Sequence, residues 1–169
     1  MARCLIIGCG CRGRALAREL AARGHRVRGT TRSAAGVSAI EAAGAEAVIG
    51  DPDVVATLTR SFEHVAVACL LLGSAVGTPA ELVALHGSRL EMLLSRMLDT
   101  TVRAVVYEAT GSVGPDVLAR GAALVRERCE GSRIPYVLLG ADPAGGSAWT
   151  RAAVRAVDRA LDGGPRRPR

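Results

Sequence analysis

Cys4-Leu5-Ile6-Ile7-Gly8-Cys9-Gly10-Cys11-Arg12-Gly13 is the stretch that decides the fold, and it runs directly into a helical pattern beginning at Arg14. A short apolar run ends on the first glycine of a Gly-x-Gly-x-x-Gly turn, which is typical of a strand, a tight turn and a helix in succession. In that setting Gly8 permits the turn, Gly10 lets a ligand approach the backbone, and Gly13 lets the helix pack closely on the strand. The alternative interpretation is a tight structural turn that binds nothing.

The beginning of this first helix is a predicted site for a diphosphate. Free N–H groups and the positive end of the helix dipole both favour an anion there. The pattern therefore favours a dinucleotide cofactor, and the candidate contacts in this loop are Gly8, Gly10, Cys11, Arg12 and Gly13.

The end of the second predicted strand, residues 25–30, indicates which dinucleotide it is. Sites for an unphosphorylated ribose carry an acidic residue about twenty positions past the glycines. Here the chain reads Thr30-Thr31-Arg32-Ser33 and has no acid. A guanidinium offers charge and a fork of donors to a 2′-phosphate, so Thr31 and Arg32 predict NADP(H) rather than NAD or FAD. The alternative is that Arg32 only solvates the start of a helix.

Asp51, which follows a third predicted strand at residues 47–50, has two interpretations. Aspartate followed by Pro52 is first of all a good helix N-cap with proline at the first helical position. The same carboxylate would also lie at the carboxyl edge of the sheet, where it could face an adenine amino group. Both roles can hold together.

Strands and helices alternate along the rest of the chain. Further strands are predicted at residues 65–71, 102–107 and 136–139, and helices at 12–23, 34–43, 79–98, 115–130 and 148–161, with a break in the third near His86-Gly87. This pattern predicts an α/β fold: a single Rossmann domain over residues 1–162, with a doubly wound parallel sheet of about six strands in the order 3-2-1-4-5-6 and helices on both faces. Residues 163–169 are expected to form a disordered basic tail.

Composition excludes several classes of protein. The 169 residues have room for one domain but not for a separate substrate domain. The net charge is +6, but three of these charges lie in the tail and no basic segment is rich in aromatic residues, so we expect no nucleic-acid partner. The longest apolar stretch, residues 65–72, is too short to span a bilayer, and the immediate strand leaves no room for a signal peptide. We expect no membrane association and a cytoplasmic location.

The five cysteines form neither a disulfide framework nor a zinc-ligand spacing, so we expect free thiols and no metal. Cys9 and Cys11 lie at a helix N-terminus, which lowers thiol pKa values and would suit a redox sensor. The alternative is that both are small residues filling the loop. His25, His64 and His86 are far apart in sequence and suggest no cluster.

The chain resembles an atypical short-chain dehydrogenase/reductase, of the NmrA-like or nucleotide-sugar-epimerase-like kind. The matching pieces are Gly8-x-Gly10-x-x-Gly13, Thr30-Thr31-Arg32 and Gly50-Asp51-Pro52-Asp53, all in the first third of the chain. The resemblance implies that Asp51 contacts adenine and that Leu72 to Ala75, with Leu72 and Gly73 foremost, line the nicotinamide side. Proteins of this kind also pair two helices with their copies across a two-fold axis.

A homodimer is therefore expected. The predicted helix 79–98 has an apolar surface wider than one stripe facing a sheet, and helix 115–130 adds to it, which an isolated chain would expose. The alternative is that the last helix covers this surface within one chain. The residues concerned are Leu82, Leu85, Leu90, Leu93, Leu94, Met97, Leu98, Val117, Leu118, Leu124 and Val125.

The departure from this family lies in the catalytic residues. Such dehydrogenases carry a Tyr-x-x-x-Lys pair, and all 22 basic residues here are arginine. The remaining candidates are Tyr107, Glu108 and Thr110, near the end of the fifth strand, with Glu108 as a general base if burial raised its pKa. The alternative is a tyrosine packed under the next helix and a solvated glutamate. Two functions remain open: an NADP-dependent oxidoreductase or epimerase-like enzyme of unknown substrate, and a non-catalytic NADP(H)-binding sensor or regulatory protein.

Overall fold

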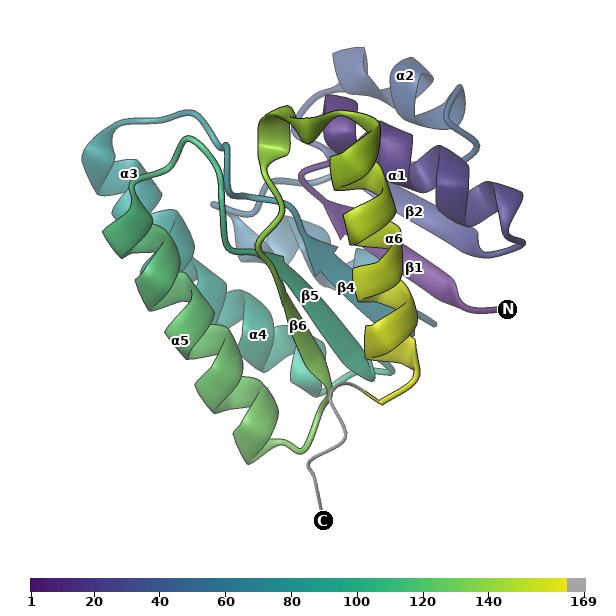
Figure 1. Cartoon of the computed structure of the whole chain (residues 1–169). Coiled ribbons are helices and arrows are strands. Elements are labelled where there is room, and N and C mark those ends of the chain that lie inside the picture. The colour runs from purple at the N-terminus through teal and green to yellow at the C-terminus, as the bar shows by residue number, and fades with distance from the viewer. Residues whose placement is uncertain (164–169) are drawn as a thin grey trace.

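A computed structural model of the chain describes residues 1–163 and is shown in Figure 1. The expected basic tail lies outside the described residues, apart from Gly163. Within residues 1–163, no helix is both long enough and apolar enough to cross a membrane.

The centre of the fold is a six-stranded, wholly parallel sheet in the order β3-β2-β1-β4-β5-β6, which confirms the predicted topology. The chain order reverses between β1 and β4, which pair side by side from Cys4 opposite Val67 to Ile7 opposite Leu70. Ligands of doubly wound folds bind in the crevice at the carboxyl ends of the strands beside such a reversal. The strands are β1 Arg3–Ile7, β2 Arg26–Thr31, β3 Glu46–Ile49, β4 Val67–Leu70, β5 Ala104–Glu108 and β6 Tyr136–Leu139.

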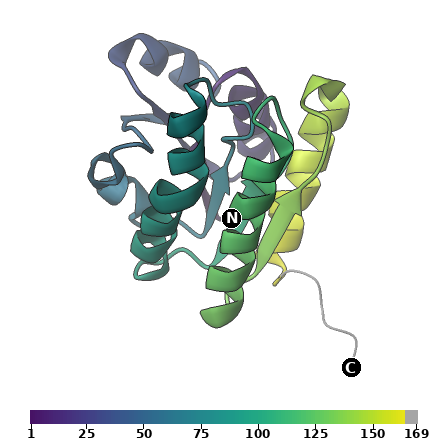
Figure 2. The ribbon, with the colours of Figure 1, turned by 90° about the vertical axis from the view of Figure 1, so that its left-hand side faces the viewer.

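Helices cover both faces of the sheet, as Figures 1 and 2 show. One face carries α1 (Cys11–Ala22), α6 (Ser147–Leu161) and, beyond a 3₁₀ turn at Ala34–Gly36, the short α2 (Val37–Glu41). The other face carries a 3₁₀ helix (Val55–Phe62), α3 (Pro79–Ala84), a π-helical turn (Leu85–Arg89), α4 (Leu90–Leu98) and α5 (Pro115–Gly131). A 3₁₀ turn at Pro143–Gly145 precedes α6.

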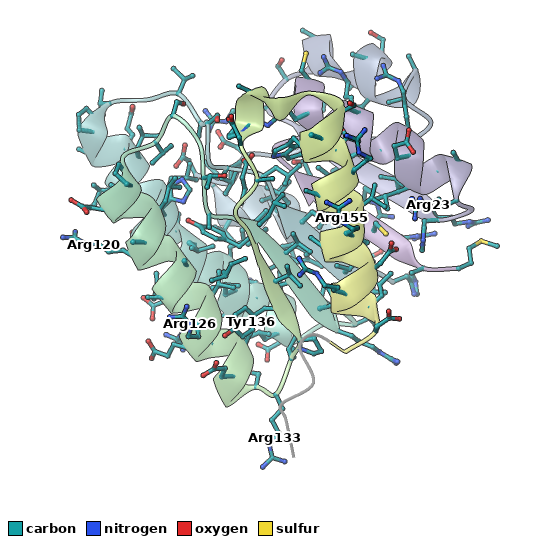
Figure 3. The ribbon with its side chains drawn as sticks, viewed as in Figure 1. Arg23, Arg120, Arg126, Arg133, Tyr136 and Arg155 are labelled. Carbon is teal, nitrogen blue, oxygen red and sulfur yellow. The ribbon has the colours of Figure 1, made fainter. Side chains whose placement is uncertain are left out.

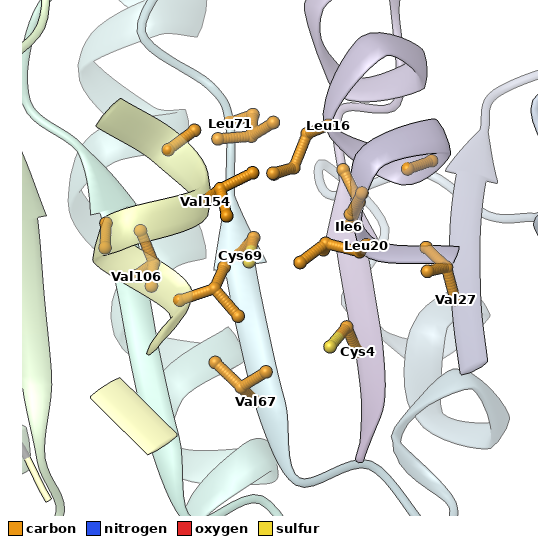
Figure 4. Packing of buried hydrophobic residues seen from close by; sticks show 14 of the residues in the cluster. Cys4, Ile6, Leu16, Leu20, Val27, Val67, Cys69, Leu71, Val106 and Val154 are labelled. Carbon is orange, nitrogen blue, oxygen red and sulfur yellow. The ribbon is translucent and has the colours of Figure 1, made fainter. Parts of the chain in front are cut away.

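Two apolar layers hold these parts together, because successive side chains of a strand point to opposite faces. Cys4 and Ile6 of β1 face Leu16 and Leu20 of α1 and Val154 of α6, as Figure 4 shows. Their neighbours Leu5 and Ile7 belong to the second layer, together with Phe62, Leu90 and Leu94. A parallel sheet buried on both faces needs such continuous apolar strands.

The predicted helix 79–98 is broken near His86-Gly87, as expected. Its start is a capping box, in which the Glu81 N–H donates to the Thr78 hydroxyl and the Thr78 N–H donates to the Glu81 carboxylate. Gly87 has φ −118° and ψ −105°, which interrupts the helix inside the π-helical turn.

The apolar surface of this helix is narrower than the sequence suggested, because five of its large apolar residues are buried within the single chain. Leu85, Leu90, Leu93, Leu94 and Met97 are at most 2% exposed within the single chain. They pack beneath the sheet with the 3₁₀ helix and α5, so the break lets both halves of the helix face inward. Val83 and Met92 are the large apolar residues of this segment that stay exposed.

The helix predicted at 34–43 is present over residues 34–41, as one 3₁₀ turn followed by five α-helical residues. The expected N-cap role of Asp51 is wrong. Asp51 caps no helix: its Oδ1 accepts the Asp53 N–H at 2.9 Å, and the next helical element begins only at Val55, with Val54 at its N-cap position. The Thr57 hydroxyl accepts the Asp51 N–H at 2.8 Å and thereby ties this turn back on itself.

Arginines are spread over the surface. Figure 3 shows Arg120 and Arg126 pointing away from α5, Arg155 from α6 and Arg23 from the turn after α1. The outward charge of the described chain is therefore distributed over separate elements.

Candidate nucleotide-binding site

The three glycines of the loop between β1 and α1 have the three geometries that the sequence predicted. Gly8 has φ +83°, and a Cβ there would lie 2.4 Å from the Leu71 carbonyl oxygen. At Gly13 a Cβ would lie 3.2 Å from the Ile6 side chain, so the helix packs tightly on the strand. A Cβ on Gly10 would meet nothing within 4 Å. The space above Gly10 is therefore open to a ligand.

A cavity of about 510 Å³ opens over this loop, within the range of small-molecule and cofactor sites. It extends from the start of α1 to the ends of β2 and β4, across the point where the strand order reverses. Arg12, Arg14 and Arg32 line it, and none of the described residues that line it is acidic. No side chain caps the first turn of α1, so its N–H groups are free for an anion.

Thr31 and Arg32 lie on the side of the cavity next to β2. Gly36 packs against the Thr31 hydroxyl so closely that a Cβ there would lie 2.2 Å from it. The Arg32 side chain is half exposed, with its guanidinium 3.5 Å from an Asp51 oxygen and 3.4 Å from an Asp53 oxygen. These contacts are longer than the roughly 2.7–2.9 Å of a tight charge-assisted bond. Asp51 therefore lies beside the 2′-phosphate candidate Arg32, a contact that the sequence did not predict.

Arg12 and Glu108 meet at the other side of the cavity. Arg12 Nη2 lies 2.7 Å from Glu108 Oε1 and donates to the Ser74 hydroxyl at 3.3 Å. Glu108 Oε2 accepts the Gly73 N–H at 2.9 Å, and the Glu108 side chain is wholly buried. The guanidinium also lies over the Trp149 ring, 5.3 Å from its centroid. Glu108 is thus neither a solvated glutamate nor a free base, because it is a buried partner of Arg12.

The loops after β4 and β5 are locked together just beyond this pair. Gly73 and Gly111 approach so closely that a Cβ on Gly111 would overlap the Gly73 carbonyl, and the Val113 N–H donates to that carbonyl at 3.0 Å. The Thr110 hydroxyl donates to the Ala141 carbonyl at 2.7 Å. The third catalytic candidate is therefore held by the β6 loop rather than pointed freely into the cavity.

Tyr107 lies in the core, as the packing interpretation expected. Its side chain is fully buried under α5, where a Cβ on Gly121 would lie 2.0 Å from the hydroxyl oxygen. The hydroxyl lies 2.7 Å from His86 Nδ1, and His86 Nε2 lies 3.1 Å from the Leu72 carbonyl. The carbonyl must accept, so Nε2 carries the proton and Nδ1 accepts the tyrosine hydrogen. Burial raises the pKa of Tyr107, with Glu108 adding to the rise, and burial lowers the pKa of His86.

The two loop cysteines differ from one another. Cys9 is buried beneath the loop against Gly29, and burial raises the pKa of its thiol to about 11, which is the opposite of an activated thiol. For Cys9 the loop-filling interpretation therefore holds. Cys11 is exposed and accepts a hydrogen bond from Arg14 at 3.4 Å. Within residues 1–163, no three His, Cys, Asp or Glu side chains are grouped so as to hold a metal ion.

Comparison with solved structures identifies the architecture. A short-chain dehydrogenase/reductase superfamily protein from Agrobacterium tumefaciens with bound NAD superposes with a TM-score of 0.67 at 20% identity, over 80% of this chain and 48% of the other. UDP-glucose 4-epimerase from Bifidobacterium longum, in complex with NAD⁺ and UDP, gives 0.66 at 17% identity, over 85% and 56%. Triphenylmethane reductase from Citrobacter sp., complexed with NADP(H), gives 0.62 at 19% identity, over 81% and 48%.

The chain has the doubly wound Rossmann fold that these structures share. The resemblance inferred from the sequence is thereby confirmed at the level of the fold, and the chain spans about half the length of these structures. No protein-family model matches the sequence, and neither does any curated protein.

Four residues in or beside this cavity were not singled out from the sequence: Arg14, Ser74, His86 and Trp149. Arg14 directly follows the glycine loop, so its place in the first turn of α1 could have been used. Ser74 lies in a stretch that was expected to line the nicotinamide side, but no local pattern marks its contact with Arg12. Trp149 comes from α6, and the contact with Arg12 spans most of the chain.

Proposed function

We propose that this chain binds NADP(H). The observation that carries the proposal is the single cavity that joins an uncapped, glycine-rich helix start to Arg32 at the end of β2. The first part suits a diphosphate and the second a 2′-phosphate, and no acidic residue lines the space between them. The dinucleotides named for the structural neighbours support a nicotinamide cofactor.

The contacts of Arg32 are weak enough to leave its guanidinium available to a 2′-phosphate. Its two carboxylate partners hold the guanidinium at the edge of the cavity through long, solvated contacts, which contribute little to stability. A 2′-phosphate offers several oxygens to the same fork of donors and can replace those contacts. With NADP(H) bound, Asp51 would be released towards the adenine, as the family resemblance implies.

The test is calorimetric titration of the chain and of Arg32→Ala with NADPH and NADH. Wild type should prefer NADPH, and the variant should lose about 1–3 kcal/mol of NADPH binding, the scale of a hydrogen bond to a charged group, with little change for NADH. Arg23→Ala, which removes an exposed arginine outside the cavity, is the matched control. Equal losses of binding free energy for NADPH and NADH would show that Arg32 does not contact the 2′-phosphate.

A second candidate, an NADP(H)-binding protein without catalysis, is favoured by a specific observation. Each of the three catalytic candidates is already engaged: Tyr107 with His86, Glu108 with Arg12 and Gly73, and Thr110 with the Ala141 carbonyl. A general acid or base must reach the proton that it transfers. Hydride transfer from NADPH to any of a panel of small carbonyls, abolished by Gly10→Val, would instead support the oxidoreductase.

A further inference from the structure

The pair formed by Arg12 and Glu108 places a cation at the nicotinamide half of the cleft. A doubly wound fold binds the two nucleotides of a dinucleotide on either side of the strand reversal. Arg32 is on the side of β2, so the second nucleotide lies towards the ends of β4 and β5. Arg12 reaches that side from the glycine loop and contacts Ser74 after β4 and Glu108 at the end of β5.

We propose that Arg12, held in this position, makes the cleft select the reduced nucleotide, NADPH, over the oxidised nucleotide, NADP⁺. The inference rests on the proposed function, because it concerns which redox form the same site prefers. The selectivity comes from the charge of the Arg12 guanidinium and requires no catalytic step.

A ligand in the cavity lies nearer to the Arg12 guanidinium than to the Glu108 carboxylate. Arg12 lines the cavity and its side chain is 30% exposed, whereas Glu108 is wholly buried and is absent from the lining. Glu108 offsets part of the positive charge, but the nearer charge dominates the interaction with a ligand. The free N–H groups at the start of α1 add to the same sign.

The Arg12 side chain is fixed in this position by three contacts. It is held by the carboxylate at 2.7 Å, by the Ser74 hydroxyl at 3.3 Å and by the Trp149 ring beneath it. Trp149 is itself 1% exposed, in the core between the sheet and α6. A fixed cation cannot relax when a second cation approaches.

The two redox forms of the nucleotide differ in the charge of the nicotinamide ring. The oxidised nicotinamide ring carries a positive charge and the reduced ring is neutral, while the phosphates and the adenosine are common to both forms. Every other contact in the cleft, including that of Arg32, therefore contributes alike to both forms. The ratio of their dissociation constants reports the field at the nicotinamide end alone.

The experiment measures the dissociation constants of NADPH and NADP⁺ by calorimetry for the wild type and three variants. Glu108→Gln removes the offsetting charge while keeping the shape of the side chain. Arg12→Met combined with Glu108→Gln removes both charges, and so avoids leaving a buried carboxylate without a partner, which alone could unfold the chain. Arg32→Ala is the matched control on the adenosine side. Circular dichroism and thermal melting establish that each variant is folded.

We expect wild type to bind NADPH on the order of tenfold more tightly than NADP⁺, the ratio that corresponds to about 1.4 kcal/mol. Glu108→Gln should raise the ratio of the dissociation constant for NADP⁺ to that for NADPH, and the double variant should lower this ratio below the wild-type value. Arg32→Ala should weaken both nucleotides without changing the ratio.

Two results would overturn the inference. Equal affinities in the wild type, or a ratio that survives in the folded double variant, would show that Arg12 does not sense the ring charge although the site binds the cofactor. Failure of the wild type to bind either nucleotide is a different result, because it would contradict the proposed function itself.

Discussion

At the scale of single residues, Gly8 and Gly10 show how neighbouring glycines serve different ends. Gly8 has a left-handed φ of +83° and no room for a Cβ beside the Leu71 carbonyl, so its reason is structural. Gly10 has φ −78° and open space where a Cβ would stand, so any residue fits there in the free protein. Because this open space lies over the cavity, Gly10 leaves room there for a ligand.

We predict that Gly10→Val abolishes nucleotide binding and leaves the fold intact, because the side chain would occupy the space needed by the diphosphate. Gly8→Ala should instead destabilise the fold. Its methyl group clashes with the backbone at a strained φ and should cost about 1–3 kcal/mol of stability. Thermal melting and NADPH titration of both variants separate the two effects. Retained NADPH binding by Gly10→Val would mean that the loop is only a structural turn.

At the same scale, the sequence predicted the backbone geometry at the glycines and the place of Arg32 beside the loop, but not the contacts of Glu108. The glycine roles follow from local backbone geometry, which a strand–turn–helix pattern determines. The contact between Arg12 and Glu108 joins residues 96 positions apart. It exists only because β4 and β5 bring the end of the fifth strand next to the first loop, which no local pattern specifies.

At the scale of elements, His86 and Tyr107 tie three parts of the fold together. His86 lies in the π-helical turn between α3 and α4, Tyr107 is in β5, and the Leu72 carbonyl follows β4 at the edge of the cavity. Gly121 of α5 leaves room for the tyrosine hydroxyl. The break in the long helix was predictable from Gly87, whereas the buried pair depends on packing and was not.

The His86 pair predicts a pH dependence of stability. Burial lowers the pKa of His86 in the folded protein, whereas a histidine in the unfolded chain has a pKa of about 6.5. Below that pH the unfolded state binds a proton that the folded state does not, so the free energy of unfolding falls as pH falls towards the folded pKa.

His86→Phe should cost about 1–3 kcal/mol at pH 7.5, because it leaves the Tyr107 hydroxyl buried without a partner. The loss of unfolding free energy relative to the wild type should shrink between about pH 7 and pH 5 in urea titrations. Over this range a histidine in the unfolded wild-type chain, with a pKa of about 6.5, becomes protonated. Tyr107→Phe is the control, since it keeps the buried histidine and should therefore keep a fall in stability towards low pH, which His86→Phe should lose. Parallel stability curves for wild type and His86→Phe would contradict this account.

At the scale of the whole molecule, the strand order was predictable because alternating strands and helices with right-handed crossovers leave few arrangements. Which apolar side chains remain exposed was not predictable, because this depends on how each helix is rotated and broken. The segment from Pro79 to Leu98 was expected to carry surplus leucines. The break at Gly87 turns its two halves so that nearly all of them face the sheet, the 3₁₀ helix or α5.

The homodimer expected from the sequence therefore has less apolar surface on which to form. The outer surfaces of the π-helical turn, α4 and α5 expose arginines, among them Arg89, Arg96, Arg120 and Arg126, the last two visible in Figure 3. The ion pair between Glu91 and Arg128 joins α4 and α5 within one chain. Acidic Asp116 and Glu127 are exposed on α5 as well, so charge alone does not decide an isologous contact, and little apolar area is left there to drive one.

We predict that the 169-residue chain is a monomer at micromolar concentration, with the mass of one chain in light scattering and sedimentation. Met92→Lys and Val83→Lys, which change the two exposed apolar residues of this segment, should leave that mass unchanged. A mass of two chains that returns to one in these variants would show that α3 and α4 form the contact after all. A dimer insensitive to both would place the interface on another face, such as the edge of the sheet at β6, where a strand of a second copy could pair.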